Sequence, residues 1–232
     1  KKWLVDDQCI VLITGSKFYR GPPFSGAVLV PNSLLKEEQH PPPLLKNLSE
    51  FLCPDELPAS LQSWRDALPR QENPGLALRW EAALSDIEAS APYSVEKAEA
   101  WAREVSRLLP EDTIECFESN RCILSLRLRS SKHSPWFDVP DLKHIYDWMT
   151  LDVSAVVPQP AAAKTLCSIG QPVQVTQSSG ILRLALGVDS LDTYTKNPET
   201  AVQHDKLLIE KLHHLAVNFD KLKENAHLLK QP

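Results

Sequence analysis

Residues 14–31, TGSKFYRGPPFSGAVLVP, limit the possible folds more than any other stretch of the chain. They follow one apolar run, CIVLI at residues 9–13, and lead into a second, SGAVLVP at residues 25–31. Continuous apolar runs rich in β-branched side chains are typical of strands buried on both faces of a parallel or mixed sheet. The sequence therefore predicts two buried strands joined by a tight loop, with Lys17 in that loop.

Lys17 follows the first strand directly, after a turn of small residues. A lysine at the carboxyl end of a sheet strand faces the crevice where open α/β sheets bind ligands. Thr14 and Ser16 supply hydroxyls beside it, and Arg20 supplies a planar fork that suits phosphate. A desolvated lysine can bond covalently to a carbonyl cofactor, so this set is compatible with a cofactor site. The alternative is a solvated lysine in an ordinary loop, since isolated lysines are mostly exposed.

The stretch resembles the cofactor-lysine segment of fold-type I pyridoxal-phosphate (PLP) enzymes, the aspartate-aminotransferase-like superfamily. In that pattern a strand ends in a Ser/Thr-x-x-Lys turn, and a Gly/Pro-rich loop leads into a strand that runs back through the sheet. The resemblance implies that Lys17 carries pyridoxal 5'-phosphate as a Schiff base. It makes Thr14, Ser16 and Arg20 further cofactor-binding residues, with Thr14 or Arg20 at the phosphate.

The resemblance also implies an α/β fold, in which the end of a PLP-transferase-like large-domain sheet is followed by a C-terminal α+β small domain. We expect the large-domain part over residues 1–91, with a Pro-rich excursion at 32–74, and the small domain over 92–232. Apolar spacing predicts a helix over 75–91. Ser94 begins a second helix, which ends at Pro110.

The second half of the chain alternates between strand and helix patterns. Residues 121–129 alternate apolar and polar side chains, which predicts a half-buried strand. A turn at Ser119-Asn120 would pair it with a strand over 113–119. The other expected elements are a helix at 139–149, strands at 166–175 and 180–188, and a long final helix beginning at Asn197-Pro198-Glu199.

Arg183 lies within the strand expected at 180–188. It is similar to the arginine on a small-domain strand that grips the substrate carboxylate in many enzymes of this superfamily. A planar guanidinium suits a carboxylate, so the resemblance implies a substrate-binding role. The alternative is a strand arginine that faces solvent.

The resemblance implies a PLP-dependent enzyme that acts on an amino acid or amine as a transaminase, lyase or decarboxylase. Lys17 would hold the cofactor and then act in proton transfer. In this superfamily the aspartate at the pyridine nitrogen, the ring-stacking side chain and the main phosphate loop lie upstream of the lysine. We therefore expect the chain to be the C-terminal part of a longer enzyme, acting as a homodimer. The alternatives are a non-catalytic protein-interaction module and a relic of the PLP fold.

Composition narrows the classes of partner and compartment. The formal net charge of −5 argues against nucleic acid or an anionic membrane surface. No apolar stretch reaches the roughly 18 residues of a membrane-spanning helix. Five scattered cysteines without a CxxC pair predict reduced thiols and a cytoplasmic protein. The histidines show no metal-ligand spacing, since His213 and His214 are adjacent, so we expect no metal site.

Overall fold

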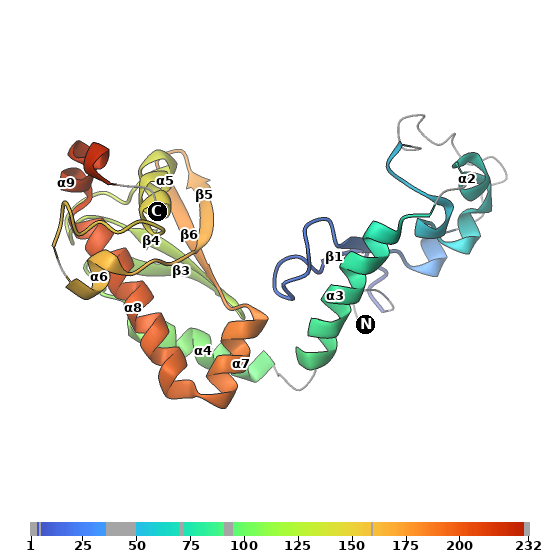
Figure 1. Ribbon diagram of the computed structural model, residues 1–232, viewed down its shortest axis with the longest axis horizontal. Coiled ribbons are helices and arrows are strands. Elements are labelled where there is room, and N and C mark those ends of the chain that lie inside the picture. Colours follow the sequence, from blue (N-terminus) through green and yellow to red (C-terminus); the bar gives the residue numbers. More distant parts are fainter. Residues whose placement is uncertain are drawn as a thin grey trace. The chain divides into compact units, whose positions relative to one another are not determined.

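The structure is a computed structural model that describes residues 4, 6–35, 50–69, 72–90, 95–158 and 160–229. The chain divides between Ser90 and Ala91 into two compact units, and each is described by itself. This division lies one residue from the boundary expected between residues 91 and 92. Each unit combines helices with one antiparallel sheet, so the chain mixes α and β structure (Figure 1).

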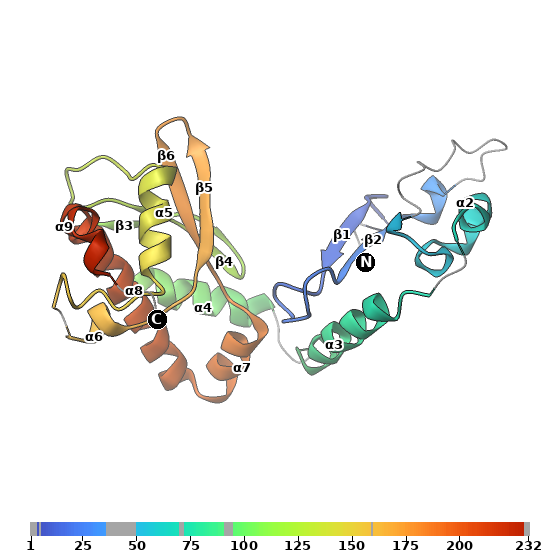
Figure 2. The ribbon, with the colours of Figure 1, turned by 45° about the horizontal axis from the view of Figure 1, so that its top comes forward.

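The first unit contains a two-stranded antiparallel sheet. Strand β1 (Val11–Thr14) pairs with β2 (Gly26–Leu29), and Thr14 lies opposite Gly26. The second strand therefore runs back along the first. Helix α3 (Pro74–Ser90) lies alongside this pair of strands (Figure 2).

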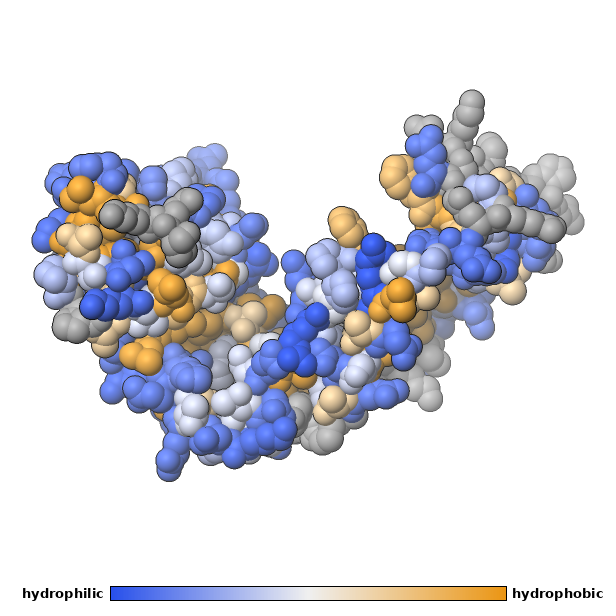
Figure 3. Space-filling view, in the orientation of Figure 1, coloured by the Kyte–Doolittle hydropathy of each residue, from blue (hydrophilic) through white to orange (hydrophobic). Residues whose placement is uncertain are grey.

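The prediction that both strands are buried on both faces is wrong. Leu12 keeps 78% of its surface exposed to solvent, and apolar surface is visible on this unit among hydrophilic side chains (Figure 3). The reason is that each strand has only the other as a hydrogen-bonded neighbour within the described residues. The exposed apolar side chains of this hairpin are Ile10, Leu12, Ile13, Phe24, Val28 and Leu29.

The Pro-rich excursion folds into short helical turns. The turns of 3-10 helix are η1 (Asn32–Leu34), η3 (Pro54–Glu56) and η4 (Ala59–Leu61), and helix α2 spans Gln62–Ala67. Proline fixes its own φ and donates no backbone hydrogen bond, which keeps such pieces short. The three consecutive prolines at 41–43 lie outside the described residues.

The second unit contains a four-stranded antiparallel sheet in the order β3-β4-β6-β5. The strands are β3 (Ile114–Asn120), β4 (Ile123–Leu128), β5 (Gly170–Thr176) and β6 (Ser179–Ala185). The predicted alternation of β4 is confirmed, because Leu124, Leu126 and Leu128 are all fully buried. Ile114 of β3 and Leu182 and Leu184 of β6 are also buried and add to the sheet's part of the core.

Helices complete the core of the second unit. They are α4 (Val95–Arg107), α5 (Val139–Trp148), α6 (Pro160–Lys164), α7 (Val188–Lys196), α8 (Pro198–Val217), α9 (Phe219–Glu224) and the 3-10 turn η5 (Ala226–Leu228). Helix α5 begins where the Asp138 side chain accepts a hydrogen bond from Asp141 N at 2.9 Å, which is a typical N-cap. Its Trp148 joins Phe137 and Phe219 in an aromatic cluster, with ring centres 4.6 Å apart for the two phenylalanines.

Four boundaries in the second unit differ clearly from the prediction, and the first is the start of β5, which lies at Gly170 rather than at residue 166. The β3–β4 turn lies at Arg121-Cys122 rather than Ser119-Asn120, because a bulge after Cys116 lengthens β3. The expected single final helix is divided at Asn218, whose φ of −106° and ψ of 17° leave the helical range. Strand β6 ends before residue 188 because α7 begins there.

Among the described residues, no helix combines the length and the apolar character that crossing a membrane would require. The cytoplasmic location stays a prediction.

The exposed apolar side chains of the hairpin predict that the protein self-associates. Leu12→Lys should shift the protein toward monomer, because a charge on an exposed strand opposes edge-to-edge pairing. Leu78→Lys is the matched control, since Leu78 is equally apolar and 71% exposed but lies on helix α3. Sedimentation velocity over a concentration series measures both variants. A monomeric wild-type protein, or an equal effect of the two substitutions, would contradict the prediction.

Candidate functional site

The loop between β1 and β2, residues 15–25, is closed by short hydrogen bonds. Gly15 N donates to Ser25 O at 2.7 Å, and Gly21 N donates to Gly15 O at 2.8 Å. The Ser25 hydroxyl donates to Pro22 O at 2.7 Å. The ends of the loop therefore meet, as in a compact surface loop packed on its own atoms. We call residues 15–25 the lysine loop.

Helix α3 packs onto the lysine loop through Ala83, which is fully buried. An ideal Cβ at Gly15 would lie 2.5 Å from the Ala83 Cβ, and one at Gly21 would lie 2.8 Å from it. Both distances fall well below the normal carbon–carbon contact of roughly 3.5–4.0 Å. Glycine is therefore required at both loop positions, and position 83 has no room for a larger side chain.

Arg20 ties the same loop to α3 by a second contact. Its Nε donates to Asp86 Oδ2 at 2.8 Å and its Nη2 donates to Asp86 Oδ1 at 2.7 Å. These hydrogen bonds lower the pKa of the Asp86 carboxyl below its usual value. Arg20 has a φ of 53°, in the left-handed region that non-glycine residues seldom adopt. The fork expected at a cofactor phosphate thus makes a bidentate pair with a helix carboxylate.

Lys17 is exposed within the lysine loop rather than desolvated, which fits the alternative interpretation of a solvated loop lysine. The hydroxyl oxygens of Thr14 and Ser16 lie 3.0 Å apart, and Ser16 N donates to Thr14 Oγ1 at 3.4 Å. The structure therefore brings the two predicted hydroxyls together next to Lys17 in the chain. What the loop offers chemically is one accessible amine and two hydroxyls, on a backbone that hydrogen bonds and α3 hold in place.

Arg183 belongs to the second unit. It lies on β6, opposite Ser125 of β4 and Gly170 of β5. Its side chain is exposed on the sheet face that points away from the buried Leu182 and Leu184. An exposed arginine there suits a ligand carboxylate, and it equally fits the alternative interpretation of a solvent-facing strand residue.

Arg127 is a neighbour of Arg183 that the sequence did not single out as a site residue. Strand alternation puts Arg127 on the same face of β4 as Ser125, so it lies diagonal to Arg183 across the β4–β6 pair. Its guanidinium carbon lies 3.9 Å from the centre of the Phe117 ring, within cation–π range. Its Nε is buried and has no hydrogen-bond partner among the described residues. The alternating polar positions within residues 121–129 are the sequence feature that could have identified Arg127 as a site residue.

Another lysine is chemically unusual but enclosed. Lys211 on α8 is fully buried, and its Nζ donates to Leu151 O at 3.0 Å and to Ala163 O at 2.9 Å. Burial lowers its pKa to about 8. Because its bonds go to backbone carbonyls inside the core, Lys211 links α8 to helix α6 and to the segment that follows α5. Of these two lysines, only Lys17 is accessible to a ligand.

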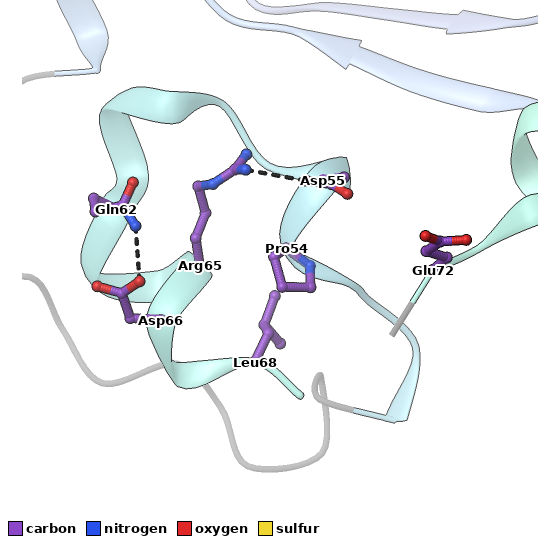
Figure 4. A pocket seen from close by; sticks show the side chains of 7 residues that line it. All are labelled: Pro54, Asp55, Gln62, Arg65, Asp66, Leu68 and Glu72. Carbon is purple, nitrogen blue, oxygen red and sulfur yellow. Dashed lines mark hydrogen bonds and ion pairs between the residues drawn. The ribbon is translucent and has the colours of Figure 1, made fainter. Parts of the chain in front are cut away.

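The Pro-rich excursion also forms an open depression of about 590 Å³ between η3 and α2 (Figure 4). Arg65 points across it and donates to Leu57 O at 2.6 Å and to Asp55 Oδ1 at 3.1 Å. Gln62 donates to Asp66 at 2.7 Å. The Arg65 bonds join α2 to the η3 turn, and the Gln62 bond lies within α2, so these polar groups have partners without a ligand.

The chain matches no protein-family model, no curated protein and no solved structure. Within the described ranges, no group of three or more His, Cys, Asp or Glu side chains is placed to hold a metal ion. All five cysteine thiols are free. The lysine loop is the candidate site on its own geometry, because it holds Lys17 beside the hydroxyls of Thr14 and Ser16.

The contact between α3 and the lysine loop yields a stability prediction. Ala83→Val should destabilise the docked loop by about 1–3 kcal/mol, because overpacking forces the glycine backbone away from the helix. Ala82→Val is the control, since Ala82 is exposed on the same helix and should change stability by less than about 0.5 kcal/mol. Segment-resolved hydrogen exchange at the Gly15 and Gly21 amides measures the effect. Equal protection of these amides in both variants would refute the contact.

Proposed function

We propose that the chain is part of a PLP-dependent enzyme acting on an amino acid or amine, with Lys17 as the residue that holds the cofactor. The observation that carries the proposal is the lysine loop, in which an accessible amine follows β1 on a backbone clamped by hydrogen bonds and by Ala83. A strand, a Thr-x-x-Lys turn, a Gly/Pro-rich loop and an antiparallel return strand occur in the order of the fold-type I segment.

The donor set of the loop fits a phosphate-bearing aldehyde in most respects. The Lys17 amine is accessible for covalent attachment, and the Thr14 and Ser16 hydroxyls can donate to phosphate oxygens. Arg20 fits less well, because Asp86 already accepts from two atoms of its guanidinium. We therefore assign Arg20 mainly to positioning the loop against α3.

When bound, the cofactor supplies an electron sink for breaking a bond at the substrate Cα. Lys17 would hold it covalently and, once displaced by the substrate amine, would move the proton with its free amine. Arg183 would orient the substrate by its carboxylate. Transaminase, lyase and decarboxylase reactions share this arrangement of roles, and we propose that the enzyme is a homodimer.

The exposed apolar hairpin favours a second candidate function, a non-catalytic protein-interaction module. Exposed apolar side chains and an open strand edge, as on this hairpin, are common features of protein contacts. Such a module would bind its partner through Leu12 and its neighbours. It would not need the Lys17 amine, so a substitution at Lys17 separates the two functions.

Lys17 should be the preferred site of covalent labelling by pyridoxal phosphate. The lysine amine bonds to the aldehyde carbon with loss of water, and borohydride then delivers hydride to give a stable secondary amine. Peptide mass spectrometry should find this adduct at Lys17 far above Lys132 and Lys196, whose side chains are also well exposed. Lys17→Ala should remove that adduct without unfolding the protein, because the side chain is exposed.

Thr14→Val is a companion variant that keeps Lys17 and the approximate side-chain shape. It removes one hydroxyl, so labelling at Lys17 should weaken for pyridoxal phosphate but not for pyridoxal, which lacks the phosphate. Labelling spread evenly over the exposed lysines would overturn the assignment of Lys17.

Arg183→Lys should weaken amino-acid binding far more than cofactor binding. Replacing a bidentate guanidinium by a single ammonium removes a charge-assisted hydrogen bond, worth about 1.5–3 kcal/mol. Calorimetric titration of the cofactor-loaded protein with amino acids measures this loss, and the affinity for the cofactor is the internal control. Unchanged affinity for amino acids would return Arg183 to the role of a solvent-facing strand residue.

A further inference from the structure

The second unit has an open depression of about 650 Å³ between helix α4 and the β3–β4 turn. Three arginines line it. Arg103 and Arg107 come from the exposed side of α4, and Arg121 comes from the turn. Ser119 and Asn120 add a hydroxyl and an amide at the end of β3. Hydrogen-bond donors from helix α4 and from the β3–β4 turn therefore line one hollow.

The charge of this lining is only partly neutralised. Arg107 pairs with Glu104 at 2.6 Å, and Glu99 also lines the depression. Neither Arg103 nor Arg121 makes an ion pair with any residue that the structure describes. The hollow is thus a local concentration of positive charge on a chain whose formal net charge is −5.

Arg121 occupies its place at a conformational cost. Its φ of 50° lies in the left-handed region, and the turn that it begins has only two residues. Glycine and asparagine dominate such positions because they adopt positive φ with the least strain. Strained backbone at a non-glycine residue is commonly found at ligand sites. A glycine would suit the turn better, so the arginine side chain needs another explanation.

We propose that this depression binds the phosphate group of a ligand, with Arg121 and Arg103 as the principal residues that contact it. An arginine fork presents several N–H donors in a plane, and two or three forks supply more donors than the two oxygens of a carboxylate accept. A phosphate group offers three strong acceptor oxygens and close to two negative charges, which matches this lining. The site lies within the second unit and is independent of the role assigned to Lys17.

The test uses Arg121→Gly on the full chain, with inorganic pyrophosphate as the probe at constant ionic strength, since salt screens exposed charges. Wild-type protein should bind the probe saturably, with amide chemical-shift changes confined to residues 99–107 and 119–121. Arg121→Gly should weaken binding about tenfold or more. The same variant should raise the midpoint of urea unfolding, because glycine relieves the positive φ. Weaker binding in a more stable protein separates ligand contact from structural damage.

Companion variants and probes make the result decisive. Arg103→Gln should also weaken binding, whereas Lys221→Gln, an exposed cation on α9 outside the depression, should not. Succinate at the same ionic strength should bind more weakly than pyrophosphate. If phosphatidic acid vesicles are captured in an Arg121-dependent manner, the phosphate chemistry stands and its source is a lipid headgroup. No saturable binding, equal losses in Lys221→Gln and Arg121→Gly, or equal affinity for succinate would overturn the proposal.

Discussion

The close approach of Ala83 to Gly15 and Gly21 is the contact on which the rest of the first unit depends. A side chain at either glycine would collide with Ala83 of the helix. Because both positions are glycine, Ala83 packs against the loop and is completely buried. The contact sets the lysine loop against α3 without the large apolar side chains of an ordinary core. The Arg20–Asp86 pair adds a directional bond between the same two elements.

This constraint gives Lys17 a fixed point of attachment while its side chain stays accessible. A covalent cofactor needs a lysine whose backbone does not drift, because catalytic groups act only when held near the productive geometry. The side chain of Lys211, in contrast, is not accessible. It is enclosed by the core and bonded to two backbone carbonyls, so its lowered pKa serves no accessible site. Accessibility combined with a rigid backbone, rather than an unusual pKa alone, distinguishes the candidate site.

Local patterns in the sequence predicted most of the strands and helices, because those depend on neighbouring residues, but they did not predict helices α6 and α7. The alternation at Leu124, Leu126 and Leu128 and the start of the final helix at Pro198 are confirmed. Burial was harder to predict. An apolar run such as residues 9–13 indicates a covered strand, but whether the strand is covered depends on neighbouring strands and helices that the run itself does not reveal. The Arg20–Asp86 pair joins residues 66 positions apart, so no local pattern reveals it. The turn at Arg121 was missed because arginine is not a turn residue.

Chemical-shift mapping with pyridoxal phosphate tests the central account most directly, because it observes every amide of the chain at once. If Lys17 holds the cofactor, the largest amide chemical-shift changes at saturating cofactor should lie at Thr14 to Ser25. They should extend along α3 to the residues beside Ala83 and Asp86. In the Ala83→Val variant, the cofactor-induced shift changes should no longer have their maximum at the lysine loop. In the Ala82→Val variant, that maximum should remain. Shifts scattered over exposed lysines of both units, with no maximum at the lysine loop, would contradict the account.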